Sequence, residues 1–262
     1  MNHPNSHSYD SSTPDPEKTP QHPEKNLQHP ADSSTQSSPD TSSSPKICGV
    51  ALDMDGLLFD TEGLYWEVGD TVLQRRGLRY SKALQSRMMG RVGVAALQQM
   101  VDFHSLEDSP ESLLAESDEL FADKLAEGVP PITGVPEWIE HLKTHQIPFG
   151  LATSSRRKFV DILFEPIAWK QDLAFILTGD DVKHGKPHPE MYLRAATKLD
   201  LSPEQMLVLE DSGNGCAAAI AARACTVAIP SIHTQDQNFE GAYLIADHIS
   251  DPRLWAMIEH AG

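Results

Sequence analysis

The chain has few cysteines, no long apolar run and no excess of basic residues. Its three cysteines, Cys48, Cys216 and Cys225, are odd in number and contain no CxxC pair, which argues against a disulfide framework and a zinc site. We therefore expect a reducing, cytoplasmic compartment. No apolar run approaches the ~18 residues that a membrane-spanning helix needs, so we predict no membrane segment.

The balance of charge is acidic. The 262-residue chain has a formal net charge of -17, and its overall field should therefore repel nucleic acids and anionic membranes. An acidic protein can still bind a phosphate where a metal ion and a lysine reverse the sign locally. We predict no nucleic-acid or membrane partner.

Residues 1–45 differ in composition from the rest. They are rich in Ser, Thr, Pro, Asp and His and have almost no apolar side chains, which predicts a disordered Ser/Pro-rich tail. The segment lacks a basic start, an apolar stretch and arginine, so we expect neither a secretory signal nor a transit peptide. Its four histidines suit a weak metal tract, but a solvated tail is the favoured interpretation. The sequence does not identify a partner for this tail.

Residues 62–127 have a helical pattern without an intervening strand. Apolar residues recur at helical spacing, and "SPESLLAESDELFADKLAEG" carries signals for both ends of a helix. Ser109 is the expected N-cap, Pro110 the first helical residue and Gly128 the residue beyond the end. We predict an all-helical cap domain over residues 62–127.

The remaining sequence alternates between strand and helix patterns. The first strand is expected in "ICGVALDMD", and further strands in "IPFGLATS", "AFILTG", "MLVLED" and "CTVAIP", with helices between them near residues 135–145, 156–164, 189–199 and 215–223. The segment "AYLIAD" and a helix over 252–260 complete the chain. This alternation predicts a parallel sheet with helices on both faces. The fold class is therefore a Rossmann-like doubly wound α/β core, residues 46–61 and 128–262, with the helical cap inserted after the first strand.

Polar residues follow these strands at their carboxyl ends. They are Asp53, Asp55 and Gly56 after the first strand, Thr153 and Ser154 after the second, Lys183 and Lys186 in the loop after the third, and Glu210 and Asp211 after the fourth. Each has a structural alternative: a turn, a helix cap or a solvent-exposed lysine. In an open parallel sheet, however, ligands bind beyond the carboxyl ends of the strands. The joint occurrence of these residues in four segments favours one site.

Phosphoryl transfer is the chemistry that suits these residue types. A carboxylate can act as a nucleophile and form an aspartyl-phosphate. Two unit charges at ~4 Å and an effective dielectric of ~20 repel by ~4 kcal/mol, so a divalent cation and a lysine must share the site. Asp53, Asp211 and a backbone carbonyl offer the oxygen ligands that Mg²⁺ prefers. Asp55 lies on the same strand face as Asp53 and can protonate the leaving oxygen and later activate water.

Four segments, "DMDGLLFDTE", "LATSS", "GKPHPEMY" and "LEDSGNGCAAA", resemble the ordered motifs of the haloacid dehalogenase (HAD) superfamily. The resemblance is to its β-phosphoglucomutase-like phosphatases with a helical cap, and it covers the chain after residue 46. It implies roles for individual residues: Asp53 as nucleophile, Asp55 as general acid/base, Asp53, Asp211 and the Asp55 carbonyl as Mg²⁺ ligands with Glu210 beside them, Thr153 and Lys186 as phosphate-binding side chains, and Ser154 and Gly56 as backbone contacts.

Departures from the family patterns narrow the expected activity. The presence of Asp55 argues against a dehalogenase or a phosphonatase. The mutases of this branch have a histidine where this chain has Tyr65, which favours a hydrolase. Arg223 stands where family members have a helix-ending glycine, and it strains a left-handed cap.

The cap offers three candidate substrate contacts, Arg87, Arg91 and Tyr65. Solvent-facing arginines and a core aromatic residue are the alternatives.

We predict a Mg²⁺-dependent phosphatase for a small phosphorylated metabolite, with a sugar phosphate as the favoured class and an aspartyl-phosphate intermediate. A sugar phosphomutase is the first alternative, and a non-catalytic binding protein is the second.

Overall fold

The computed structural model describes residues 46–88, 91 and 93–259. The predicted tail, residues 1–45, lies outside the described residues. Six strands form one parallel sheet in the order β3-β2-β1-β4-β5-β6, which confirms the predicted Rossmann-like fold class. The strands are β1 (Gly49–Leu52), β2 (Phe149–Ala152), β3 (Ile176–Leu177), β4 (Met206–Glu210), β5 (Cys225–Ala228) and β6 (Leu244–Ile245).

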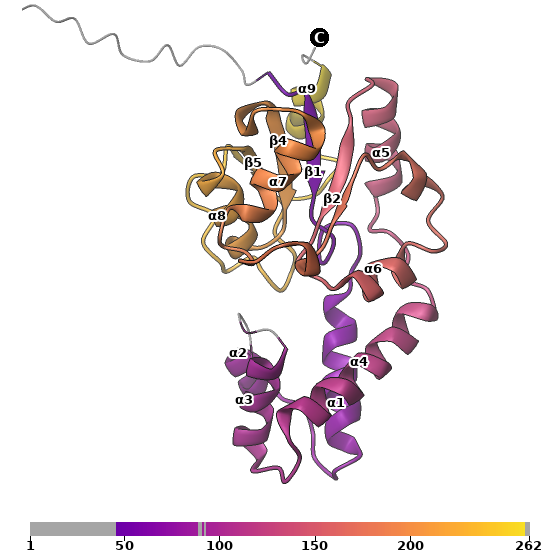
Figure 1. Cartoon of the computed structure of the whole chain (residues 1–262), viewed down its shortest axis with the longest axis vertical. Coiled ribbons are helices and arrows are strands. Elements are labelled where there is room, and N and C mark those ends of the chain that lie inside the picture. The colour runs from indigo at the N-terminus through magenta and orange to yellow at the C-terminus, as the bar shows by residue number, and fades with distance from the viewer. Residues whose placement is uncertain (1–45, 89–90, 92, 260–262) are drawn as a thin grey trace, which may run out of the picture. The chain divides into compact units, whose positions relative to one another are not determined.

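Helices cover both faces of this sheet. On one side lie α5 (Val135–Thr144), α6 (Arg157–Leu163) and α9 (Pro252–Glu259), and on the other lie α7 (Glu190–Leu199) and α8 (Gly213–Ala221). Figure 1 shows α5 and α7 on opposite sides of β1 and β2. The described residues contain no helix that is both long enough and apolar enough to cross a membrane.

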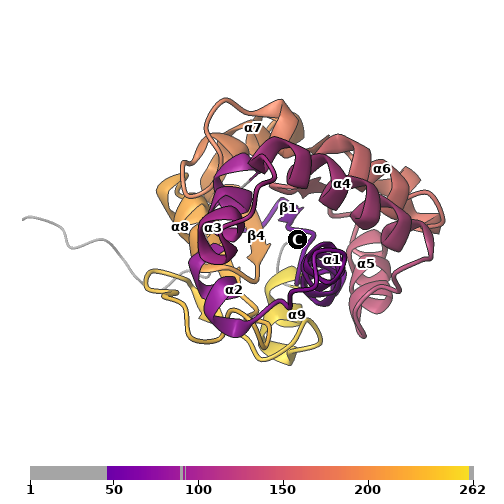
Figure 2. The same ribbon diagram turned by 90° about the horizontal axis from the view of Figure 1, so that it is seen from below.

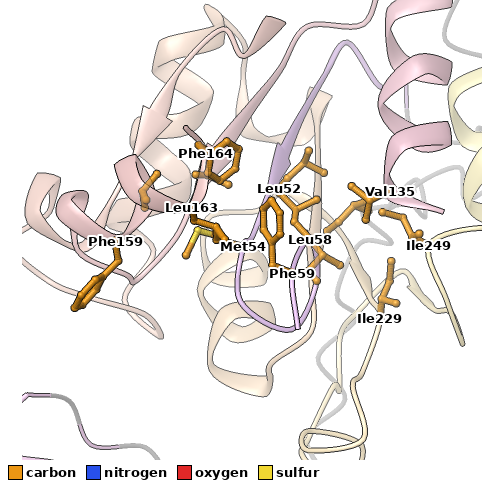
Figure 3. Close-up of a cluster of buried hydrophobic side chains, with 14 of the residues drawn as sticks. Leu52, Met54, Leu58, Phe59, Val135, Phe159, Leu163, Phe164, Ile229 and Ile249 are labelled. Atoms are coloured by element: carbon orange, nitrogen blue, oxygen red, sulfur yellow. The ribbon is translucent and has the colours of Figure 1, made fainter. Parts of the chain in front are cut away.

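Successive residues of a strand point to opposite faces of the sheet, and the residues on the two faces differ in size. Val50 and Leu52 belong to the larger apolar cluster on the α5 side, whereas Ala51 packs in the cluster of α7 and α8. In Figure 3, Leu52 and Phe59 lie between Phe164 and Val135. The alanines of the other face allow α7 and α8 to approach the sheet closely.

Four helices follow β1: α1 (Glu62–Gln74), α2 (Lys82–Met88), α3 (Val94–His104) and α4 (Pro110–Ala126). Figures 1 and 2 show them grouped together. The predicted ends of α4 are confirmed: the Ser109 side chain accepts a hydrogen bond from the Ser112 amide at 3.1 Å, and Gly128 has φ 94°. The division into a cap domain and a core domain stays a prediction.

Helix α4 contacts the core helix α6 through charged and aromatic side chains. The Asp118 carboxylate binds Arg156 and, at 2.8 Å, Lys158. The ring of Phe121 meets the ring of Phe159 edge-on, with centroids 4.9 Å apart. The helical segment is therefore attached to the core at α6 as well as through the chain itself.

Some element boundaries differ from the sequence prediction. Helix α8 begins at Gly213 instead of Gly215 because the Ser212 hydroxyl caps it by accepting from the Gly215 amide at 3.1 Å. Three short 3-10 helices, η1 (Ala168–Asp172), η2 (Gly179–Asp181) and η3 (Pro203–Gln205), were not expected. Arg223 adopts φ 69° just beyond α8, the left-handed conformation that its place in the sequence predicts.

Candidate active site

The sheet order explains why polar residues from distant segments meet. Strand β1 lies between β2 and β4, and its last residue, Leu52, is in register with Leu151 of β2 and Leu209 of β4. The residues that follow these strands therefore emerge at one edge of the sheet. The structure brings together Asp53 and Asp55 after β1, Thr153 after β2, Glu210 and Asp211 at the end of β4, and Lys186 from the loop before α7.

Lys186 is the buried cation of this site, with only 5% of its side chain exposed. Its ammonium group donates to Asp53 Oδ1 at 2.5 Å, to Glu210 Oε1 at 2.6 Å and to the Ala152 carbonyl at 2.9 Å. These contacts occupy its three donors. Burial alone lowers the pKa of Lys186, but the charges of Asp53 and Glu210 outweigh that effect and raise it. The group therefore stays cationic.

Three buried carboxylates share this one lysine. Asp53, Glu210 and Asp211 each offer an oxygen, and these oxygens lie within 4.8 Å of one another. Burial and then the charge of Glu210 raise the pKa of Asp53 despite the opposing effect of Lys186. Burial and the charge of Asp53 raise the pKa of Asp211 to about 9. With one lysine beside three buried carboxylates, simultaneous ionisation of all three is therefore disfavoured.

Glu210 is fully buried, and both of its oxygens have partners. Oε1 accepts from Lys186 and, at 2.5 Å, from the Tyr192 hydroxyl. Oε2 accepts from the Ser212 hydroxyl at 3.0 Å and from the Ser212 amide at 3.3 Å. Glu210 is thus fixed by donors on several sides. Within the described part of the chain, the Asp211 carboxylate accepts a side-chain hydrogen bond only from Thr234, at 3.4 Å.

Hydroxyl groups hold the carboxylate of Asp55. Thr61, the residue before α1, donates to Oδ1 at 2.5 Å, and Ser155 donates to Oδ2 at 2.6 Å. Thr153 is fully buried; its hydroxyl lies 3.4 Å from Asp55 Oδ2 and accepts from the Ser155 amide at 3.0 Å. Thr153 therefore orders the loop after β2 and does not act as the α6 N-cap, a position that Arg156 occupies.

The turn after Asp55 requires glycine. Gly56 has φ 75°, and a Cβ atom at this position would lie 2.3 Å from Asp211 Oδ2. The amide of Gly56 donates to the Phe59 carbonyl at 2.8 Å, which closes the turn. The chain can thus pass close to the acidic cluster only because no side chain is present there.

The predicted cap contacts lie apart from this cluster. The Arg87 guanidinium packs over the ring of Phe103 at 5.1 Å, and Arg91 donates to the Arg87 carbonyl at 2.5 Å. The Tyr65 ring stacks on Phe121 with centroids 4.4 Å apart, and 48% of Tyr65 is exposed. Of these three side chains, the Tyr65 phenol is the one influenced by the site, since burial and then the charge of Asp55 raise its pKa.

Sequence reasoning missed four residues of the site as functional candidates. Ser155 and Thr61 carried a usable signal because each lies within a recognised motif. Tyr192 and Thr234 carried none, since a tyrosine in an amphipathic helix and a threonine in a loop have many ordinary roles. Ser154 is exposed, and its expected backbone contact with phosphate stays a prediction.

Residues 50–229 match the family of haloacid dehalogenase-like hydrolases. The chain belongs to this family. This result confirms the superfamily and the hydrolase class that the four motifs predict. A phosphorylated carbohydrates phosphatase from Thermotoga maritima is 34% identical over 177 residues, which cover 66% of this chain and 80% of the relative.

Two further relatives show how far the similarity extends. A bifunctional riboflavin kinase/FMN phosphatase from Arabidopsis thaliana is 29% identical over 207 residues, and the match covers 78% of this chain but only 54% of that protein. The crystal structure of CbbY from Rhodobacter sphaeroides in complex with phosphate has a TM-score of 0.70. Its sequence identity is 24%, and the match covers 81% of this chain and 99% of CbbY. That likeness shows the shared fold.

Proposed function

We propose that the protein is a Mg²⁺-dependent phosphatase that hydrolyses a small phosphorylated metabolite, with a sugar phosphate as the favoured substrate class. The observation that carries this proposal is the buried contact of Lys186 with Asp53 beside the cluster of Asp53, Glu210 and Asp211. A reactive carboxylate, a cation and further oxygen ligands are the groups that phosphoryl transfer to an aspartate requires. The activity named for the Thermotoga maritima relative supports the substrate class.

The donor set fits a magnesium ion. Carboxylate oxygens are the ligands that Mg²⁺ prefers. Burial, followed by the charges of neighbouring carboxylates, raises the pKa values of Asp53 and Asp211, and a cation bound between them would favour their ionised forms. Asp53, Asp211 and the Asp55 carbonyl would hold the ion. Glu210 would lie beside it, because its oxygens are already occupied by Lys186, Tyr192 and Ser212. A bound Mg²⁺ supplies positive charge that offsets repulsion between Asp53 and a phosphate.

The side chains of the site have separate roles in the proposed reaction. Asp53 attacks the phosphorus atom, and the bond from phosphorus to the leaving oxygen breaks. Asp55 gives its proton to that oxygen and later takes one from the water that attacks the aspartyl-phosphate. Inorganic phosphate then leaves, and the Asp53 carboxylate is restored. Lys186 faces Asp53 and neutralises charge on the transferred group, while Thr153 and the backbone amides after β2 bind its oxygens.

A sugar phosphomutase remains the alternative function, and Tyr65 argues against it. The position at which related mutases carry a histidine holds a phenol ring stacked on Phe121. A phenol has no basic nitrogen with which to take up a proton near neutral pH. We therefore favour transfer of the phosphoryl group to water over transfer to a second sugar hydroxyl.

The first experiment is hydrolysis of p-nitrophenyl phosphate by the purified full chain with Mg²⁺. Activity should be abolished by Asp53→Asn and preserved in Asp161→Asn, a matched change at an exposed position on α6. A panel of sugar phosphates then identifies the preferred substrate, and conversion of β-glucose 1-phosphate to the 6-phosphate tests for a mutase. Full activity of Asp53→Asn would remove Asp53 as the nucleophile, and a Mg²⁺-supplemented protein without phosphatase activity would favour a binding role.

A further inference from the structure

Tyr192 lies on α7, directly behind the acidic cluster, and is fully buried. Its hydroxyl donates to Glu210 Oε1 at 2.5 Å, and the centre of its ring lies 5.0 Å from the ammonium nitrogen of Lys186. One side chain thus contacts both partners of a buried ion pair, the anion through its hydroxyl and the cation through its ring.

The contacts of Lys186 show how Tyr192 can influence the position of its ammonium group. Its ammonium group meets Glu210 on one side and Asp53 on the other, at 2.6 and 2.5 Å. The position of Lys186 therefore depends on the position of Glu210 Oε1, and Tyr192 is the other side chain that binds that oxygen. Loss of the hydroxyl would free Glu210 Oε1 to move, and Lys186 would follow it away from Asp53.

A role in packing alone does not account for the hydroxyl. Tyr192 belongs to the apolar cluster formed by α7, α8 and the alanine-rich face of the sheet. A phenylalanine would fill nearly the same volume and make the same apolar contacts. The hydroxyl adds a polar group that has to be paired when buried, and its partner is a carboxylate of the candidate active site.

We propose that Tyr192 is a positioning residue that sets the Lys186 ammonium group against Asp53, through Glu210 and through its ring. Its effect on turnover rests on the proposed phosphatase function, but its effect on Lys186 does not. Tyr192 contacts no reacting atom; it acts on the reaction through Lys186.

The test compares the wild-type protein with Tyr192→Phe, which keeps the ring, and Tyr192→Leu, which removes both contacts. The native full chain is treated briefly with trinitrobenzenesulfonate, and labelling of Lys186 is measured by peptide mass spectrometry relative to Lys183. Lys183 is an exposed lysine of the same loop and serves as an internal standard. We expect the Lys186 to Lys183 ratio to rise several-fold in Tyr192→Phe and further in Tyr192→Leu.

The same variants are assayed with p-nitrophenyl phosphate and Mg²⁺. We expect Tyr192→Phe to lower kcat about ten-fold and to change KM less than about two-fold. The lost hydrogen bond joins two residues of the protein and does not involve the substrate, so substrate binding should change little. Tyr243→Phe, at a position that is 58% exposed, should change neither readout. An unchanged labelling ratio in Tyr192→Phe overturns the proposal, as does an equal rise at Lys183 and Lys186, which would indicate general loosening. A risen ratio in a protein without phosphatase activity would uphold the positioning role and contradict the proposed function.

Discussion

The Ser155 hydroxyl lies 2.6 Å from Asp55 Oδ2, although the two residues are 100 positions apart in the chain. Thr61 donates to the other oxygen of the same carboxylate at 2.5 Å. Ser155 belongs to the loop after β2, and Thr61 precedes the first helix of the inserted segment. The orientation of the proposed general acid therefore depends on residues from the core and from the start of the helical insert.

Removal of the Ser155 hydroxyl should impair the proton transfer assigned to Asp55. Hydrogen bonds to charged groups contribute ~1.5–3 kcal/mol, so Ser155→Ala should lower kcat roughly ten-fold or more. The loss should be smaller for p-nitrophenyl phosphate, whose leaving group needs little protonation, than for an alkyl phosphate. Ser202→Ala, which changes a hydroxyl at the opposite end of β4, is the control. Equal losses on both substrates would contradict the assigned role of Asp55.

Gly56→Ala should weaken metal binding. The new Cβ would lie 2.3 Å from Asp211 Oδ2, and φ at this position is 75°. Strain of this kind costs ~1–2 kcal/mol, and the carboxylate of a proposed Mg²⁺ ligand would be displaced. We expect a higher Mg²⁺ concentration for half-maximal activity and weaker Mg²⁺ binding by calorimetry.

Gly63→Ala is the matched control for that change. A Cβ at Gly63 meets no atom within 4 Å, and alanine favours a helix over glycine by ~0.5–1 kcal/mol. This variant should bind Mg²⁺ as the parent does and unfold at a slightly higher temperature. Equal Mg²⁺ affinity in the two variants would contradict the close approach of Gly56 to a metal ligand.

Arg223→Gly should stabilise the protein. Arg223 adopts φ 69° beyond the end of α8, a conformation that costs a side chain ~1–2 kcal/mol and glycine very little. Its ion pair with Glu204, at 3.0 Å, is exposed and contributes little. Chemical denaturation should show a gain of ~0.5–1 kcal/mol. Arg223→Ala removes the ion pair but keeps the strain, so an equal gain in that variant would refute the explanation.

The helical insert should lose stability at low pH through Asp108. Arg76 donates to the two Asp108 oxygens at 2.9 and 2.8 Å and to Glu116 at 2.8 Å, which ties α1 to α4. The hydrogen bonds from Arg76 hold the pKa of Asp108 below its usual value. Their contribution is therefore present above the unfolded pKa of ~3.9 and is lost as the pH falls through the folded value.

Arg76→Met should accordingly lower the unfolding midpoint at pH 7 by a few degrees, and this effect should shrink as the pH falls below the unfolded pKa of Asp108, ~3.9. Because the pair is partly exposed, the free energy of unfolding at pH 7 should be lower in Arg76→Met than in the parent by ~1 kcal/mol. Arg79→Met is the control, since Arg79 is 75% exposed and lies 3.3 Å from Asp70. A difference between Arg76→Met and the parent that stays constant from pH 7 to pH 3 would contradict the role of Asp108.

The centre of the sheet could be predicted from the sequence because β1, β2 and β4 are buried throughout and therefore appear as continuous apolar runs. The ends of α4 could be predicted because capping depends on local residues, Ser109 and Gly128. The start of α8 could not, since Ser212 competes for the cap position with Glu210 and Asp211, whose side chains are directed into the acidic cluster.

The candidate site could be predicted wherever a residue follows a strand. Asp53 and Asp211 meet because β1 and β4 are neighbours, a consequence of the parallel order. The hydrogen bond from Tyr192 to Glu210 depends on how α7 packs against the sheet, and the hydrogen bond from Thr234 to Asp211 depends on the path of a loop. Neither has a local signature in the sequence, so both needed three-dimensional information.

The most direct test of the account is to trap the phosphorylated enzyme. The protein is mixed with excess substrate and Mg²⁺, quenched in acid within milliseconds and digested for mass spectrometry. The account predicts one added phosphoryl group on the peptide that contains Asp53, lost on mild base treatment and absent in Asp53→Asn. Rapid turnover without any phosphorylated peptide, or a phosphoryl group on a peptide that lacks Asp53, would contradict the central claim that Asp53 is the nucleophile.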